Sequence, residues 1–226
     1  MTAQTGIRRL FVGDLHGCLN ELNDLLDLFG FVPGQDTLFS VGDVVGKGPH
    51  VLGLLHRLRE LKAFVVRGNH DAFLLKAASL PESQREPRDK TYLSSLGLEE
   101  TEWLKYISAW PVYLDLPDII LVHGGLEPGK KSLADMSPKV MMKIRTWDGE
   151  GKKLYERTDP PWFECVQTDK TVVFGHWAER GLIDLPKFKG LDSGCVYGGT
   201  LTGWCPEENR FVQVKAQKQY AEIHFP

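Results

Sequence analysis

Residues 8–17, RRLFVGDLHG, decide the fold, because an apolar run passes directly into glycine, aspartate and histidine. The run from Leu10 to Val12 is rich in residues that favour a β-strand. The next segment, CLNELNDLLDLFG, places leucine and phenylalanine at helical spacing and ends at Gly30. We therefore expect a strand that ends at Asp14 and a helix that follows it.

The same alternation recurs along the first third of the chain. TLFSVGD, residues 37–43, has the pattern of a second strand. A helix is expected from Pro49 to about Leu61, because proline favours the first helical turn. KAFVVRGNHD, residues 62–71, follows as a third strand. This βαβαβ opening indicates an α/β fold.

The remaining two thirds are less regular. The polar segment LPESQREPRDK, residues 80–90, is expected to be a surface excursion, since apolar helical patterning resumes at Tyr92. Short strands are expected in DIILVHGG, KTVVFGHW and FKGLDSGC, and TLTGWCPEENRFVQVKA has the pattern of a closing hairpin that turns near residues 206–209. We expect a single domain over residues 1–226.

The composition limits the classes of function. The chain has 226 residues, 30 acidic and 27 basic side chains and a net charge of -3, so it lacks the positive excess of proteins that coat DNA or RNA. No run of about 18 apolar residues occurs, so no membrane association is expected. The four cysteines are scattered, which favours free thiols in a reducing compartment. We expect a monomer inside the cell, with the cytoplasm favoured and targeting to an organelle left open.

Polar residues gather where the expected strands end. These ends are Gly13-Asp14 with His16, Gly42-Asp43, Gly68-Asn69-His70-Asp71, His123-Gly124, Gly175-His176 and Asp192-Ser193-Gly194. Each pair, taken singly, is more typical of an ordinary turn. Because open α/β sheets carry their sites at the carboxyl ends of strands, the set as a whole indicates a metal site.

The types of residue narrow the choice of metal. Imidazole nitrogens with carboxylate or amide oxygens suit manganese, iron or zinc, and the lack of cysteine argues against a structural zinc site. Six ligands exceed the need of one catalytic ion. Two ions about 3.5 to 4 Å apart, bridged by a carboxylate and a water, would use them all. We therefore expect two divalent ions, with manganese favoured over iron or zinc.

The ordered motifs resemble those of a known family. They are GDLHG, GDVVGKGP, RGNHD, HGG, GHW and LDSGCVYGG, and they extend over residues 11–199. In this order they are similar to the motifs of the calcineurin-like metallophosphoesterases. Within that family they resemble the phosphoprotein phosphatase group, most closely its ApaH-like branch, which is related to bacterial symmetrical diadenosine tetraphosphatase. The resemblance implies two packed mixed β-sheets flanked by helices, and a phosphohydrolase activity.

The resemblance also implies roles for individual residues. It implies one ion bound by Asp14, His16 and Asp43, and a second ion held by Asn69, His123 and His176, with Asp43 as the bridge between them. It makes His70 the general acid for the leaving oxygen, and it turns Lys47 and Arg67 towards the phosphate. Arg145 is a further candidate phosphate contact or, equally, a solvated helix arginine.

The pair Gly46-Lys47 departs from the motif of the protein serine/threonine phosphatases, which have Asp-Arg at these two positions. In those enzymes the aspartate orients the catalytic histidine. Its absence should weaken His70 as a proton donor, and a phosphate leaving from an anhydride needs that proton less than a serine alkoxide does. Asp71 is an alternative orienting group. Lysine in place of arginine exchanges a rigid fork for a mobile point charge, which suits a flexible polyphosphate.

These observations favour a hydrolase of phosphoanhydride bonds. Dinucleoside polyphosphates, inorganic polyphosphate and nucleotide-capped RNA ends are the candidate substrates. A protein serine/threonine phosphatase with the same ions is one alternative, and a non-catalytic phosphate-binding module is another. The basic residues between 129 and 157 form either an electropositive rim or a solvated face. Among the tryptophans, only Trp177 lies near the expected site.

Overall fold

Two five-stranded β-sheets form the centre of the computed structural model, which describes residues 7–222. The first sheet has the order β10-β9-β1-β2-β3, with bounds β10 (Arg210–Lys215), β9 (Thr200–Cys205), β1 (Arg9–Val12), β2 (Thr37–Ser40) and β3 (Phe64–Val65). Its β1, β2 and β3 are parallel, and Phe11 lies opposite Phe39 in the register of β1 and β2. β9 pairs antiparallel with both β1 and β10.

The second sheet has the order β4-β5-β6-β8-β7. Its strands are β4 (Tyr113–Asp115), β5 (Ile119–Val122), β6 (Thr171–Phe174), β8 (Phe188–Gly190) and β7 (Ile183–Leu185). The inner strands β5, β6 and β8 are parallel, and the edge strands β4 and β7 are antiparallel to their neighbours. Both sheets are therefore mixed, as the sequence motifs imply.

Alternate side chains of the strands build two kinds of core. Side chains from both sheets meet in one cluster, which includes Phe11, Phe39, Ile119, Leu121, Val173 and Trp204. The neighbours of Phe11 in β1, Leu10 and Val12, belong instead to the cluster on the other face of the first sheet. This period of two is the expected behaviour of strands with both faces buried, and it places one sheet against the other.

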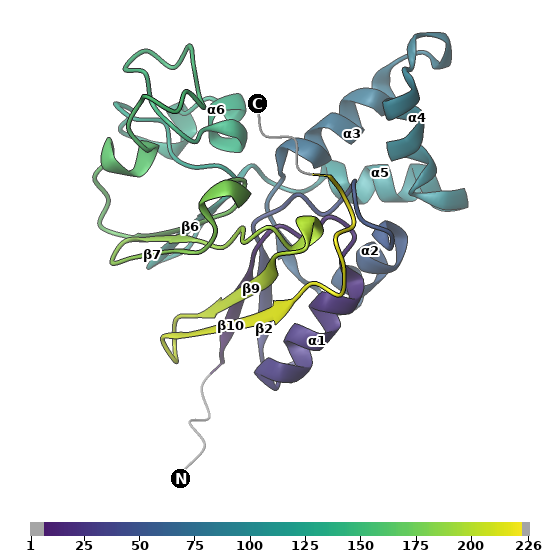
Figure 1. Ribbon diagram of the computed structural model, residues 1–226, viewed down its shortest axis with the longest axis horizontal. Coiled ribbons are helices and arrows are strands. Elements are labelled where there is room, and N and C mark those ends of the chain that lie inside the picture. Colours follow the sequence, from purple (N-terminus) through teal and green to yellow (C-terminus); the bar gives the residue numbers. More distant parts are fainter. Residues whose placement is uncertain (1–6, 223–226) are drawn as a thin grey trace.

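Helices cover the outer faces of the two sheets (Figure 1). The α-helices are α1 (Leu19–Phe29), α2 (Val51–Glu60), α3 (Asn69–Ser79), α4 (Pro87–Ser94), α5 (Glu100–Ser108) and α6 (Pro138–Lys143). Short 3-10 helices lie in the connections: η1 (Glu82–Gln84), η2 (Gly97–Glu99), η3 (Leu133–Asp135), η4 (Trp162–Glu164), η5 (Ala178–Arg180) and η6 (Cys195–Tyr197). None of the helices within residues 7–222 is long and apolar enough to cross a membrane.

Several expected elements are confirmed. The first helix ends at Gly30, which adopts the left-handed conformation with φ of 72°, as a glycine C-cap does. The closing hairpin consists of β9 and β10, and its turn covers residues 206–209. The α/β class and the two-sheet sandwich are also as expected.

Other expectations were wrong in their bounds. The third strand ends at Val65, and helix α3 begins at Asn69, inside the segment expected to be a strand. The polar segment 80–90 is not wholly a loop, because α4 begins at Pro87. There the side chain of Asp89 accepts a hydrogen bond from the Glu86 amide at 2.9 Å, which caps the helix. The edge strands β4 and β7, with 3 residues each, were not expected.

Candidate active site

The polar strand ends converge on one cavity of about 630 Å³. Its lining includes Asp14, His16, Asp43, Lys47, Asn69, His70, Arg88, Arg145, His176, Asp192 and Tyr197. β1 and β2 of the first sheet lead to Asp14 and Asp43, and β6 and β8 of the second sheet lead to His176 and Asp192. The cavity therefore lies at the carboxyl ends of strands from both sheets, where parallel strands place their functional residues.

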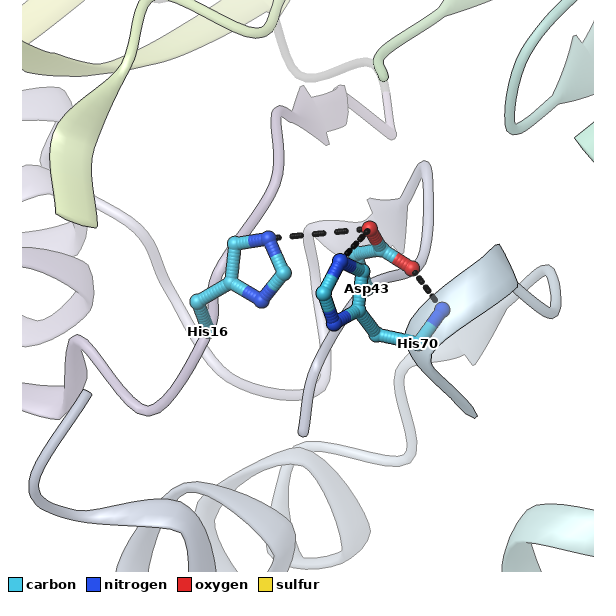
Figure 2. Close-up of side chains that lie close together, drawn as sticks. All are labelled: His16, Asp43 and His70. Carbon is cyan, nitrogen blue, oxygen red and sulfur yellow. Dashed lines mark hydrogen bonds and ion pairs between the residues drawn. The ribbon is translucent and has the colours of Figure 1, made fainter. Parts of the chain in front are cut away.

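Asp43 is the centre of this cluster (Figure 2). Its Oδ2 atom lies 3.6 Å from Nε2 of His16, 3.9 Å from Nε2 of His70 and 3.4 Å from Nε2 of His123. Nitrogen atoms of His16 and His70 and an oxygen of Asp43 lie within 4.8 Å of one another, and so do the ligand atoms of Asp43, His123 and His176. A carboxylate shared by two such groups has the placement of a bridging ligand.

Backbone carbonyls fix the orientation of the histidine rings. Nδ1 of His16 lies 3.1 Å from the carbonyl of Val45, and Nδ1 of His123 lies 2.8 Å from the carbonyl of Val41. When Nδ1–H donates to the carbonyl, the lone pair of Nε2 faces the cluster, as is usual for a metal-ligating histidine. His176 is reversed: its Nε2 lies 3.1 Å from the Lys143 carbonyl, which leaves Nδ1 as the ligand atom.

The electrostatics of the cluster favour cations. Asp14, Asp43 and Asp192 are all buried. Burial, together with Asp192 and Asp43, raises the pKa of Asp14 well above its usual range. Burial acts to lower the pKa of His123, but Asp43 and Asp14 outweigh it and raise this pKa to about 10. Because only a neutral imidazole ligates a metal, ion binding here would displace a proton from His123.

These residues fit two divalent ions. Burial holds the pKa values of His16 and His176 well below their usual range, so both rings are neutral and ready to bind a cation. Asn69 adds an amide oxygen, which lies 3.0 Å from Nε2 of His123. Nitrogen and oxygen donors around buried carboxylates are the ligands of manganese, iron or catalytic zinc.

Several of the candidate ligands lie at unusual backbone conformations. Non-glycine residues with positive φ are uncommon, and among the described residues they include His16, Asp43, Lys47 and His176, with φ values of 40°, 49°, 66° and 66°. Such strained positions cluster at functional sites. A Cβ atom at Gly175 would lie 2.0 Å from Oδ1 of Asp14. The glycine before this ligand therefore makes room for a carboxylate from another strand.

The comparisons with known proteins agree with this geometry. The model of the calcineurin-like phosphoesterase family matches residues 7–214. The chain is a calcineurin-like metallophosphoesterase.

Two relatives narrow its place in the family. The metallophosphoesterase is 30% identical to the symmetrical bis(5'-nucleosyl)-tetraphosphatase of Aromatoleum aromaticum, over 92% of this chain and 97% of the relative. It is 33% identical to a protein of solved crystal structure that is provisionally described as a diadenosine tetraphosphatase, with a TM-score of 0.78 and coverage of 96% of each chain. The enzyme is therefore related to the symmetrical tetraphosphatases.

A third likeness concerns the fold alone. A protein serine/threonine phosphatase from Saccharomyces cerevisiae has a TM-score of 0.58 and 15% identity, over 100% of this chain and 83% of that one.

Of the three residues that were expected to contact phosphate in this metallophosphoesterase, two line the cavity and one does not. Lys47 lines the cavity, where its Nζ lies 2.7 Å from the Tyr197 hydroxyl and 3.2 Å from Nε2 of His16. Arg145 also lines it. Arg67 is directed elsewhere, because its guanidinium donates to the carbonyls of Ser108 and Trp110 at 2.6 and 2.8 Å. The geometry gives no support to a phosphate contact by Arg67.

Sequence reasoning assigned no role to Asp192, Arg88 and Tyr197, which line the cavity, or to Tyr92, which contacts His70. Asp192 was noted as a strand end but received no role. Arg88 and Tyr92 lie on α4, and this helix begins in the segment that was expected to be a surface excursion. The proline at the first helical position and the acidic residue two positions later were the signals that could have revealed a helix there.

Trp177 and two of the basic residues between 129 and 157 have structural roles away from the cavity. Trp177 is buried among Phe163 and its neighbours in the core beside the second sheet, and it is not among the residues that line the cavity. Of the basic residues between 129 and 157, Lys153 and Arg157 form exposed ion pairs with Glu156 and Glu179. They therefore belong to a solvated face.

Asp71 holds the loops that carry the ligands. Its Oδ2 accepts hydrogen bonds from the amides of Gly68 and Asp43, both at 2.9 Å, and its Oδ1 accepts from Val44 and Val45 at 3.0 and 3.2 Å. This carboxylate is fully occupied by backbone amides, so Asp71 does not orient His70.

We expect Asp71→Asn to lower the free energy of unfolding by about 3 kcal/mol, since the new amide group would face donors and leave buried N–H groups without an acceptor. Urea unfolding of the metal-free protein measures this change. Asp89→Asn is the matched control, because this buried carboxylate caps one helix end outside the site, and it should cost about 1 kcal/mol. Equal losses in the two variants would contradict the assigned role of Asp71.

Proposed function

We propose that this metallophosphoesterase hydrolyses phosphoanhydride bonds in dinucleoside polyphosphates, with two divalent ions, manganese favoured, as its cofactors. The observation that carries the proposal is the set of cations around the metal cluster. Lys47 follows β2, Arg88 lies on α4 and Arg145 follows α6, and all three line the same cavity. A single phosphate needs fewer positive groups than a polyphosphate chain, whose charge extends over several phosphoryl units.

The protein residues have separate tasks in this reaction. Divalent ions held by the aspartate, asparagine and histidine side chains of the cluster would polarise the phosphoryl oxygens and activate the attacking water. Lys47 is charged, because Asp43 and Tyr197 outweigh burial and raise its pKa, and it pairs with a phosphate oxygen. His70 gives the proton on Nε2 to the leaving oxygen as the P–O bond breaks.

The properties of His70 as a proton donor also favour anhydrides as substrates. Burial lowers the pKa of His70 to about 4, and position 46 supplies no carboxylate that would stabilise the charged ring. A serine alkoxide depends strongly on protonation when it leaves, whereas a nucleoside polyphosphate leaves with less help. The solved protein serine/threonine phosphatase resembles this chain in fold alone, at 15% identity. The relatives named as symmetrical tetraphosphatases match over most of their length.

The test compares rates on four substrates under identical conditions with manganese. They are diadenosine tetraphosphate, long-chain polyphosphate, a nucleotide-capped RNA and a phosphoserine peptide. We expect the tetraphosphate to give the highest kcat/KM and to yield two molecules of ADP, with at least about 100-fold less activity on the peptide. Metal-free protein is the blank. Preference for the peptide would replace the proposal with the protein phosphatase alternative, and preference for capped RNA or polyphosphate would change the substrate class.

A further inference from the structure

Tyr92 lies against the ring nitrogen of His70 that faces away from the metal cluster. The Tyr92 hydroxyl makes a short hydrogen bond with Nδ1 of His70. The two rings are nearly parallel, at 17°, with their centroids 6.0 Å apart. On the other side of the imidazole, Nε2 lies 3.9 Å from Oδ2 of Asp43. The hydroxyl therefore holds Nδ1 of His70, while Nε2 of the same ring faces the cluster.

Gly46 leaves the space that Tyr92 fills. A Cβ atom at position 46 would lie 2.5 Å from both the hydroxyl oxygen and Cζ of Tyr92. This distance is far below van der Waals contact, and φ at Gly46 is 83°, where side chains are disfavoured. An aspartate at position 46 and a tyrosine at position 92 thus exclude each other in this backbone.

Packing keeps Tyr92 in place. Its side chain is 7% exposed and belongs to the core on the helical side of the first sheet. The ring of Phe73 meets it edge to face, with centroids 4.9 Å apart, and the guanidinium of Arg88 lies 5.6 Å from its centroid. Burial raises the pKa of Tyr92, so the hydroxyl keeps its proton at neutral pH. A residue fixed in this way can fix its partner.

We propose that Tyr92 is the positioning residue of His70 and takes the place of the carboxylate that protein phosphatases have at position 46; this inference rests on the proposed function of His70 as the acid. A hydroxyl donates to Nδ1 when this nitrogen carries no proton, and it accepts from Nδ1–H when the nitrogen is protonated. Tyr92 therefore orients His70 in both states without adding negative charge. After His70 gives the Nε2 proton to the leaving oxygen, Nδ1–H still donates to Tyr92.

Tyr92→Phe removes the hydroxyl and keeps the ring. We expect kcat on p-nitrophenyl phosphate to fall about 3-fold and kcat on phenyl phosphate, a poorer leaving group, to fall about 30-fold. KM and metal content should stay within about 2-fold. In the His70→Asn background the same substitution should cause no further loss, since it acts through that ring. Unchanged kcat on both substrates, or an equal additional loss without His70, would overturn the proposal.

Tyr106→Phe is the matched control. Tyr106 lies on α5 and packs on Trp103 and Trp110, and it is not among the residues that line the cavity. Its substitution should leave kcat on both aryl phosphates within about 2-fold of the unsubstituted enzyme, which corresponds to about 0.4 kcal/mol in activation free energy.

A second measurement needs no turnover. In metal-free protein labelled with ¹⁵N-histidine, the Nδ1 resonance of His70, assigned by its loss in His70→Asn, should shift in Tyr92→Phe and stay unchanged in Tyr106→Phe. An unchanged resonance in Tyr92→Phe would overturn the contact. If the aryl phosphates are cleaved and dinucleoside polyphosphates are not, the proposed substrate is wrong while the test of Tyr92 still stands.

Substitutions at positions 46 and 92 test directly whether the two side chains compete for the same space. Gly46→Asp alone should lower kcat on phenyl phosphate by about 100-fold, because the new side chain collides with Tyr92 and displaces His70. Gly46→Asp combined with Tyr92→Ala should recover at least about 10-fold of that loss, since the aspartate then has room beside Nδ1. Additive losses in the double variant would overturn the claim that these two positions share one space.

Discussion

Asp43→Asn is expected to lower the bound metal from two ions to fewer than one per chain and to reduce turnover more than about 1,000-fold. The reason lies in how the carboxylate is used. Oδ1 accepts the backbone N–H of His70 at 2.8 Å, so an asparagine will keep its oxygen there. Its NH₂ group will then occupy the position of Oδ2, which faces the Nε2 atoms of His16 and His123. A donor replaces the bridging anion.

Elemental analysis of dialysed protein and steady-state rates measure these two effects. Asparagine tolerates the positive φ of this position, so the backbone should persist, and circular dichroism checks that it does. Asp89→Asn, a buried carboxylate outside the cavity, should retain its ions and its rate. Full occupancy and full activity in Asp43→Asn would disprove the bridging role.

His70→Asn is expected to cut kcat about 100-fold on a poor leaving group such as phenyl phosphate, with a smaller loss on an anhydride, while the metal content stays unchanged. The imidazole supplies a proton to the leaving oxygen, and the anhydride depends less on that proton. His56→Asn is the control, because His56 is exposed on α2 and outside the cavity.

Metal analysis of the same variant decides between two roles of His70. Its Nε2 is grouped with His16 and Asp43 at distances that a bound ion could span, so the geometry offers His70 as a ligand as well as an acid. Loss of one ion in His70→Asn would assign it to the ligands and leave the acid unidentified. Retention of both ions with the expected loss of turnover assigns it to proton transfer.

The strand ends could be predicted from the sequence because their pattern is local. An apolar run followed by glycine and a polar residue indicates a strand and its approximate end. Parallel neighbours then bring these strand ends together. His16, Asp43 and His123 were found in this way, and the structure places the rings of His16 and His123 near Oδ2 of Asp43. Which of these side chains bind ions stays a prediction.

The contacts of the cavity wall could not be predicted, since they depend on how helices pack. Tyr92 reaches His70 only because α4 packs on α3, and a polar segment with two prolines gives little sign of a helix that does so. The family resemblance implied a phosphate contact by Arg67, which lies two residues after β3. Its guanidinium donates instead to the backbone carbonyls of Ser108 and Trp110. These contacts depend on the tertiary structure and leave no local signal in the sequence.

The candidate ligands come from both sheets, so the geometry of the site depends on how the two sheets pack. His16 and Asp43 follow strands of the first sheet, and His123 and His176 follow strands of the second. The apolar interior between the sheets, with Phe11 among its residues, joins the two sets of loops. A substitution that changes the packing of this interior would therefore move the two halves of the site relative to each other, although no polar residue is altered.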